Sequence, residues 1–123
     1  LLGIVHAACP CASWDEFAEA LRTGWVRTPT GLRNSKSAMD DLIDGALWSR
    51  TRIQAMDDSI VEGVRAVVVG HTPMQRTTSL GNTIFIDTGG WLPRGAGFTI
   101  LDAATLNAVT IPHAIESLHW EDA

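Results

Sequence analysis

Two apolar runs with the same ending mark the centre of the sequence. They cover residues 66–69 and 83–86, and each run stops at polar residues and glycine. Such short unbroken runs are typical of strands buried on both faces, and the loop after the carboxyl end of such a strand is where α/β proteins bind ligands. Residues 1–6 repeat the pattern. We therefore expect a buried strand that starts at the first residue and leads to His6, as the run 66–69 leads to His71.

Helical periodicity predicts two amphipathic helices and a third, shorter one. Ser13 and Glu16 form a capping-box pattern at the start of a helix over residues 13–22. Apolar residues at three-to-four spacing predict a second helix over residues 37–50. The apolar residues of this helix are Met39, Leu42, Ile43, Leu47 and Trp48. Residues 57–64 predict a short helix that leads into the central strand.

The remaining segments are loops and short strands. Residues 23–35 lack periodicity and predict a long loop that overhangs the two histidines. A turn at residues 80–82 and apolar runs at 97–101 and 106–111 predict hairpins that extend the sheet. In the acidic tail, Leu118 and Trp120 are expected to dock on the core. This order of elements indicates an α/β (α+β) fold.

Composition narrows the class of protein. A chain of 123 residues, 46% hydrophobic and 19% charged, is typical of one globular domain. The net charge of -5 and the lack of any Lys/Arg run argue against nucleic acid or an anionic membrane as partner. No apolar segment approaches the ~20 residues that span a bilayer, and no signal region opens the chain. We therefore expect a cytoplasmic protein.

The two cysteines, Cys9 and Cys11, flank Pro10 and are too close for an unstrained disulfide. A reducing compartment is the simpler interpretation, because a zinc site would need further soft ligands and the chain has no other cysteine.

Histidines are the candidate metal ligands. A single histidine at a strand end is usually a hydrogen-bonded structural residue, but His6 and His71 share the same context. Neighbouring parallel strands would bring them within several ångströms of each other, where two neutral imidazoles suit Zn, Mn, Fe or Ni. His113 and His119 are expected to be solvated surface residues.

Four segments, in this order, resemble the C-terminal half of calcineurin-like metallophosphoesterases. They are Val-His-Ala at 5–7, Leu-Trp-Ser-Arg at 47–50, Val-Gly-His-Thr-Pro at 69–73 and Ile-Asp-Thr-Gly at 86–89. The most similar branch is the bacterial and phage serine/threonine protein phosphatases, which include the bacteriophage lambda enzyme. The resemblance covers roughly residues 1 to 102.

The resemblance implies two divalent ions, with manganese expected and iron or zinc as alternatives, between two stacked mixed sheets flanked by helices. It makes His6 and His71 ligands of one ion, and it makes Arg50 the catalytic residue that binds the substrate phosphate. A planar guanidinium suits bidentate recognition of phosphate. Asp87 either orients a ligand histidine or caps its own turn, and we favour the turn.

The motifs of the family that supply the remaining metal ligands are absent from the sequence. We therefore interpret residues 1–123 as one domain, the C-terminal half of a metallophosphoesterase domain, and we expect it to be inactive alone. The implied function is hydrolysis of phosphorylated proteins or small phosphoesters by a metal-activated water. The alternatives are a dinucleoside-polyphosphate hydrolase and a non-catalytic module that binds a partner through Trp25 and Trp48. Most of the five tryptophans are expected in the core.

Overall fold

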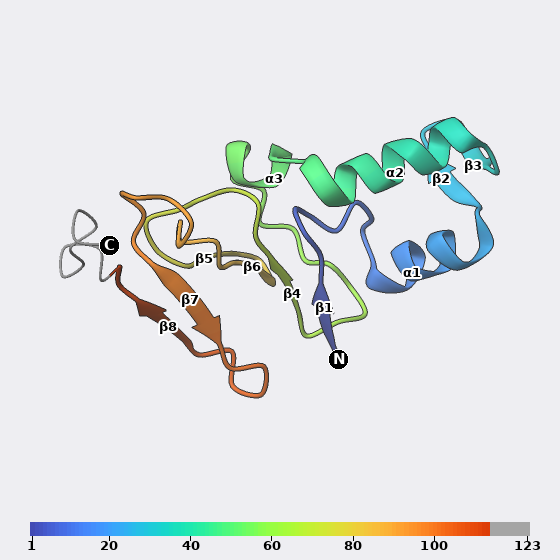
Figure 1. Ribbon diagram of the computed structural model, residues 1–123. Coiled ribbons are helices and arrows are strands. Elements are labelled where there is room, and N and C mark those ends of the chain that lie inside the picture. The colour runs from blue at the N-terminus through green and yellow to red at the C-terminus, as the bar shows by residue number, and fades with distance from the viewer. Residues whose placement is uncertain (114–123) are drawn as a thin grey trace.

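The computed structural model describes residues 1–113 and shows an α+β fold around a four-stranded mixed sheet (Figure 1). The strand order is β1 (Leu2–Ile4), β4 (Ala66–Val69), β6 (Thr83–Phe85) and β5 (Thr78–Leu80). β1, β4 and β6 are parallel, whereas β5 runs antiparallel to β6. The carboxyl ends of the three parallel strands therefore meet at one edge of the sheet, as the sequence predicts.

β4 is the central strand, and all four of its residues are buried. Its apolar side chains pack on both faces of the sheet, which explains why the run has no polar alternation. The core cluster around it includes Phe17 from α1, Leu42 from α2 and Phe85 from β6. The predicted buried strand over 66–69 is confirmed.

Two of the predicted helices are confirmed as α1 (Trp14–Thr23) and α2 (Lys36–Trp48). The Ser13 side chain caps α1 by accepting a hydrogen bond of 3.0 Å from the backbone N–H of Glu16. The Glu16 carboxylate lies 3.3 Å from Arg27, in an ion pair with the following hairpin. The first half of the capping box is thus present, and Glu16 contributes an ion pair to the next element.

The buried face of α2 differs from the predicted one. Its buried residues are Ala38, Leu42 and Ala46, whereas Ile43, Leu47 and Trp48 are at least 38% exposed. The small residues face inward because the loop after β1 approaches the helix closely. The N–H of Ala7 donates to the carbonyl of Ala46 at 2.8 Å, and a Cβ added at Gly45 would lie 3.1 Å from Pro10.

Residues 23–35 form a hairpin, so the prediction of a long loop there is wrong. Its strands are β2 (Val26–Thr28) and β3 (Gly31–Arg33), and the Thr28 hydroxyl donates to the carbonyl of Gly31 at 2.8 Å across the turn. Strands of three residues are too short to show an alternating pattern. The hairpin packs at the end of α2 remote from α3 (Figure 1), so it does not overhang the histidines.

Residues 57–64 do not form the predicted helix. The short helix instead precedes them as α3 (Thr51–Gln54). The backbone of Glu62 pairs with the segment before α1, accepting from Trp14 at 2.7 Å and donating to Ala12 at 3.0 Å. Partners distant in the sequence thus replace the bonds that a helix would make within itself.

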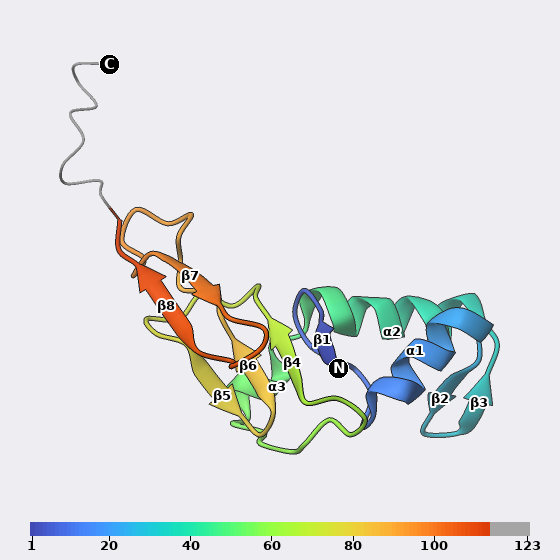
Figure 2. The same cartoon turned by 90° about the horizontal axis from the view of Figure 1, so that it is seen from below.

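The last two strands are β7 (Phe98–Leu101) and β8 (Ala108–Ile111), which form an antiparallel hairpin. The predicted strands are confirmed. The β5–β6 hairpin extends the main sheet as predicted, but β7 and β8 form a separate two-stranded sheet. Figures 1 and 2 show this sheet on the side of β4 and β6 that faces away from α1 and α2.

Several apolar side chains that we expected to be buried are exposed. β1 is an edge strand, and its Ile4 is 75% exposed, so the prediction of a fully buried first strand is wrong. On β7 and β8 the exposed apolar residues are Phe98, Ile100, Val109 and Ile111. Among the described tryptophans, Trp25, Trp48 and Trp91 are at least half exposed, which contradicts the expectation that most are core. Leu118, His119 and Trp120 lie outside the described residues.

Within residues 1–113, no helix is long and apolar enough to cross a membrane.

Candidate metal and phosphate site

The structure brings His6 and His71 together at the carboxyl ends of β1 and β4. The two strands pair in parallel, and the backbone ladder continues past them because the N–H of Gly70 donates to the carbonyl of His6 at 2.9 Å. The Nε2 atom of His6 lies 3.2 Å from the Nδ1 atom of His71, and the ring centroids are 5.0 Å apart. The proximity predicted from the two strand ends is confirmed.

The backbone of His71 adopts a left-handed conformation, with φ of 70°. Residues other than glycine rarely adopt it, although histidine does so more often than most, and such strained positions cluster at functional sites. β4 ends at Val69, so the left-handed residue lies in the loop that follows the strand.

A backbone carbonyl fixes the tautomer of His71. Its Nε2 atom lies 3.2 Å from the carbonyl oxygen of Trp48 at the end of α2. A carbonyl oxygen can only accept, so Nε2 carries the hydrogen, and in the neutral ring Nδ1 presents its lone pair to His6. The indole of Trp48 also packs edge-on against the imidazole, with centroids 5.6 Å apart. This is the arrangement that metal-ligating histidines adopt, with the second nitrogen held by a hydrogen bond.

The spacing of the two nitrogens fits two ligands of one ion. With metal–nitrogen bonds of about 2.0–2.1 Å and a tetrahedral angle, two ligating nitrogens lie roughly 3.3–3.4 Å apart. The observed separation is 3.2 Å. Within residues 1–113, no group of three or more His, Cys, Asp or Glu side chains could hold an ion. Within the described residues, the candidate ligands are therefore the two imidazoles.

Asp87 follows β6 at the same edge of the sheet. Its Oδ1 atom accepts a hydrogen bond of 3.0 Å from the N–H of Gly89, which confirms the predicted role in its own turn. The group that orients His71 is the carbonyl of Trp48, which we did not identify from the sequence. A backbone carbonyl is present at every residue, so the identity of residue 48 carries no signal for this role.

Arg50 lies between α2 and α3, two residues after the carbonyl that holds His71. It occupies the N-cap position of α3, makes no side-chain cap bond there, and is exposed to solvent. The structure therefore places the backbone of Arg50 two residues after the carbonyl that binds His71, and its side chain makes no hydrogen bond or ion pair within residues 1–113.

A cleft of about 450 Å³ opens beside the two imidazoles. Its walls come from the ends of β1, β4 and β6 and from β7. The polar side chains that line it are His6, His71, Asp87, Thr88 and Thr99. The histidines can therefore be reached by a ligand of small-molecule size.

The other candidate side chains are separate from this pair. His113 is half-buried, with Nε2 3.2 Å from the carbonyl of Gly89 and its ring 6.3 Å from that of Phe98, so the expectation of a solvated residue is wrong. Cys9 and Cys11 are free thiols. Burial raises the pKa of both thiols, that of Cys11 to about 12. A raised pKa disfavours the thiolate that binds metals.

In comparisons with known proteins, no family model and no curated protein matches the chain.

Proposed function

We propose that this chain contributes a metal ligand pair and a phosphate-binding arginine to a metal-dependent phosphomonoesterase, of the serine/threonine protein phosphatase type in the calcineurin-like family. The main support for the proposal is that Nε2 of His6 and Nδ1 of His71 lie 3.2 Å apart, while Nε2 of His71 is hydrogen-bonded to the carbonyl of Trp48. The four motifs that resemble the family give the proposal its reaction class. They include both histidines and Arg50.

In this proposal His6 and His71 hold one divalent ion through Nε2 and Nδ1, the two atoms that face each other. Manganese is the expected ion, with iron or zinc as alternatives, and imidazole suits all three. When bound, the metal site supplies an activated water and stabilises charge on the phosphoryl oxygens. Arg50 binds the phosphate of the substrate through the two parallel N–H groups of its planar fork.

A second ion and carboxylate ligands complete the proposed centre. The described residues offer no such cluster around the histidines, so the proposal requires these ligands from outside residues 1–113. The proposed substrates are phosphorylated proteins or small phosphoesters. The free thiols of Cys9 and Cys11 fit a reducing compartment, and we propose the cytoplasm.

The two tryptophans of the alternative binding module do not form one surface. Trp25 precedes the β2–β3 hairpin and Trp48 ends α2, and Figure 1 shows the hairpin and α3 at opposite ends of that helix. A helix of 13 residues is about 20 Å long. The geometry therefore favours the metal site over a partner surface that includes both tryptophans.

The proposal is tested by phosphatase assays with Mn²⁺ of the intact enzyme, by which we mean residues 1–123 together with the polypeptide that supplies the second ion's ligands in this proposal. Substrates are p-nitrophenyl phosphate, a phosphothreonine peptide and diadenosine tetraphosphate, and the last of these reports the alternative hydrolase activity. His6→Ala and His71→Ala should each lower turnover at least about a hundredfold, because a ligand of the metal is lost. His113→Ala is the matched control and should retain turnover. Full activity in both site variants would contradict the proposal.

A further inference from the structure

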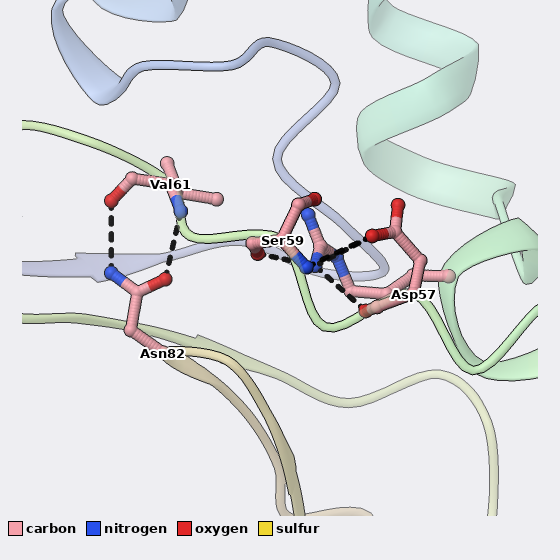
Figure 3. Close-up of polar contacts among 5 residues, drawn as sticks. Asp57, Ser59, Val61 and Asn82 are labelled. Atoms are coloured by element: carbon pink, nitrogen blue, oxygen red, sulfur yellow. Dashed lines mark hydrogen bonds and ion pairs between the residues drawn. The ribbon is translucent and has the colours of Figure 1, made fainter.

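Arg52 is enclosed, although it lies only two residues from the exposed Arg50. Its side chain is 12% exposed. The Nη1 atom donates to the carbonyl of Asp57 at 3.0 Å and to the carbonyl of Ser59 at 2.8 Å (Figure 3). One guanidinium nitrogen therefore joins α3 to the loop that follows it.

The helix α3 is too short to be stable without contacts to other segments. α3 has four residues, no side-chain cap and no fully buried residue. A single helical turn is unstable alone, because nucleation fixes several residues for one hydrogen bond. The carbonyl of Arg50 accepts the first of these bonds, from the N–H of Gln54 at 3.0 Å. The position of Arg50 thus depends on what anchors α3.

The loop that Arg52 binds is firmly anchored. The carboxylate of Asp57 accepts from the N–H of Ser59 at 2.9 Å, and this hydrogen bond lowers the pKa of Asp57. Farther along, the side chain of Asn82 bonds both backbone groups of Val61 at 2.8 Å (Figure 3). The carbonyl of Asn82 accepts from Val67 in β4 at 2.9 Å. Polar contacts therefore run from α3 to the strand that leads to His71.

We propose that Arg52 is a positioning residue, which holds α3 against residues 57–59 so that Arg50 faces the phosphate beside His6 and His71. This inference rests on the proposed function, in which Arg50 binds phosphate. Arg52 is not among the residues that line the cleft beside His6 and His71, so in this proposal it acts through Arg50 and does not bind the substrate itself.

Replacement by lysine should affect the two arginines differently. Both hydrogen bonds of Arg52 come from one nitrogen, so the ammonium of a lysine, with three donors, can replace them. Arg50 needs its planar fork for bidentate binding, which lysine lacks. Arg52→Lys should therefore bind phosphate as the wild type does, whereas Arg52→Met and Arg50→Lys should bind it more weakly.

The test measures the inhibition constant of inorganic phosphate, together with KM and kcat for p-nitrophenyl phosphate, in the Mn²⁺-loaded intact enzyme. Arg52→Met should raise the inhibition constant about tenfold, and Arg52→Lys should change it less than about twofold. If Arg52→Met does not fold, Arg52→Gln takes its place, because its amide is polar but ends two bonds short of the position of Nη1 and should likewise raise the inhibition constant. A lower melting temperature with an unchanged inhibition constant would mean a merely structural role and would overturn the inference.

A double-mutant cycle decides whether Arg52 acts through Arg50. In the Arg50→Ala background, Arg52→Met should weaken phosphate binding no further, because the positioned group is already absent. Additive losses would overturn the inference in favour of direct contact by Arg52. If Arg50→Ala leaves phosphate binding unchanged, the proposed role of Arg50 fails and the inference fails with it. If Arg50→Ala weakens binding and Arg52→Met does not, the inference alone fails.

Discussion

The Nε2 atom of His6 and the Nδ1 atom of His71 face each other at 3.2 Å, at the ends of two parallel strands. Because His71 donates its other N–H to the carbonyl of Trp48, its Nδ1 atom is free to accept a hydrogen bond or to bind an ion. Without metal, the N–H of His6 can donate to it. With metal, the other tautomer of His6 lets both nitrogens bind the same ion.

Arg50→Lys should weaken phosphate inhibition of the intact enzyme about tenfold, because lysine keeps the charge but loses the bidentate fork. Metal content, measured by mass spectrometry, should stay at the wild-type level, since Arg50 is not one of the proposed metal ligands. Unchanged inhibition by phosphate would show that Arg50 does not bind the substrate.

Residues 1–123 alone should show no phosphatase activity with excess Mn²⁺. The histidine pair leaves most of the coordination sphere to water, so the ion is bound weakly and its water is poorly activated. The exposed Ile4 and Phe98 should also favour self-association, measured by light scattering. Turnover like that of the intact enzyme would refute the assignment of an incomplete site.

Two buried threonines allow a matched test of how much the hydrogen bonds of a buried hydroxyl contribute to stability. Thr83 is 1% exposed, and its hydroxyl has no hydrogen-bond partner in the described part of the chain. Thr88 is 2% exposed, and its hydroxyl bonds the carbonyl of Gly97 at 2.6 Å and the hydroxyl of Thr99 at 2.7 Å.

Thr83→Val should therefore leave the free energy of unfolding unchanged or raise it by up to about 2 kcal/mol, whereas Thr88→Val should lower it by about 1–3 kcal/mol. Urea unfolding measures both variants. Equal losses would show that the Thr83 hydroxyl has a partner in solution.

The stability of the chain should fall at alkaline pH because of Cys11. Burial raises the pKa of this thiol to about 12, whereas an unfolded thiol titrates near pH 8.5. Between these values the folded state keeps a proton that the unfolded state has lost, so the free energy of unfolding decreases as pH rises from about 9 toward 12. Cys11→Ser should reduce this decrease in urea unfolding at pH 7 and pH 10. An identical pH dependence in the variant would contradict the shifted pKa.

Local patterns predicted the elements that are held by local interactions. β4 was evident from four adjacent apolar residues, and the start of α1 from the capping residue Ser13. The prediction of a helix over residues 57–64 is wrong because it rests on the helical spacing of Val61 and Val64. Their backbone groups instead bond the side chain of Asn82, which is distant in the sequence. Such a partner cannot be inferred from the segment itself.

The same distinction applies to the site. The proximity of His6 and His71 follows from two equivalent strand ends in a parallel sheet, which sequence patterns reveal. The contact of the Trp48 carbonyl with His71 and the burial of the Arg52 side chain depend on how α2 and α3 pack. Neither can be predicted from the type of residue at these positions. The sequence could therefore predict the proximity of the two histidines and not the groups that orient them.

The central claim, that His6 and His71 bind one ion, is tested most directly by counting nitrogen ligands. Electron spin-echo spectroscopy of Mn²⁺ bound to residues 1–123 detects the coordinated imidazoles and needs no turnover. The account predicts two coupled nitrogens in the wild type and in His113→Ala, and one in either His6→Ala or His71→Ala. Bound Mn²⁺ without coupled nitrogens, or with two in both single variants, would contradict it.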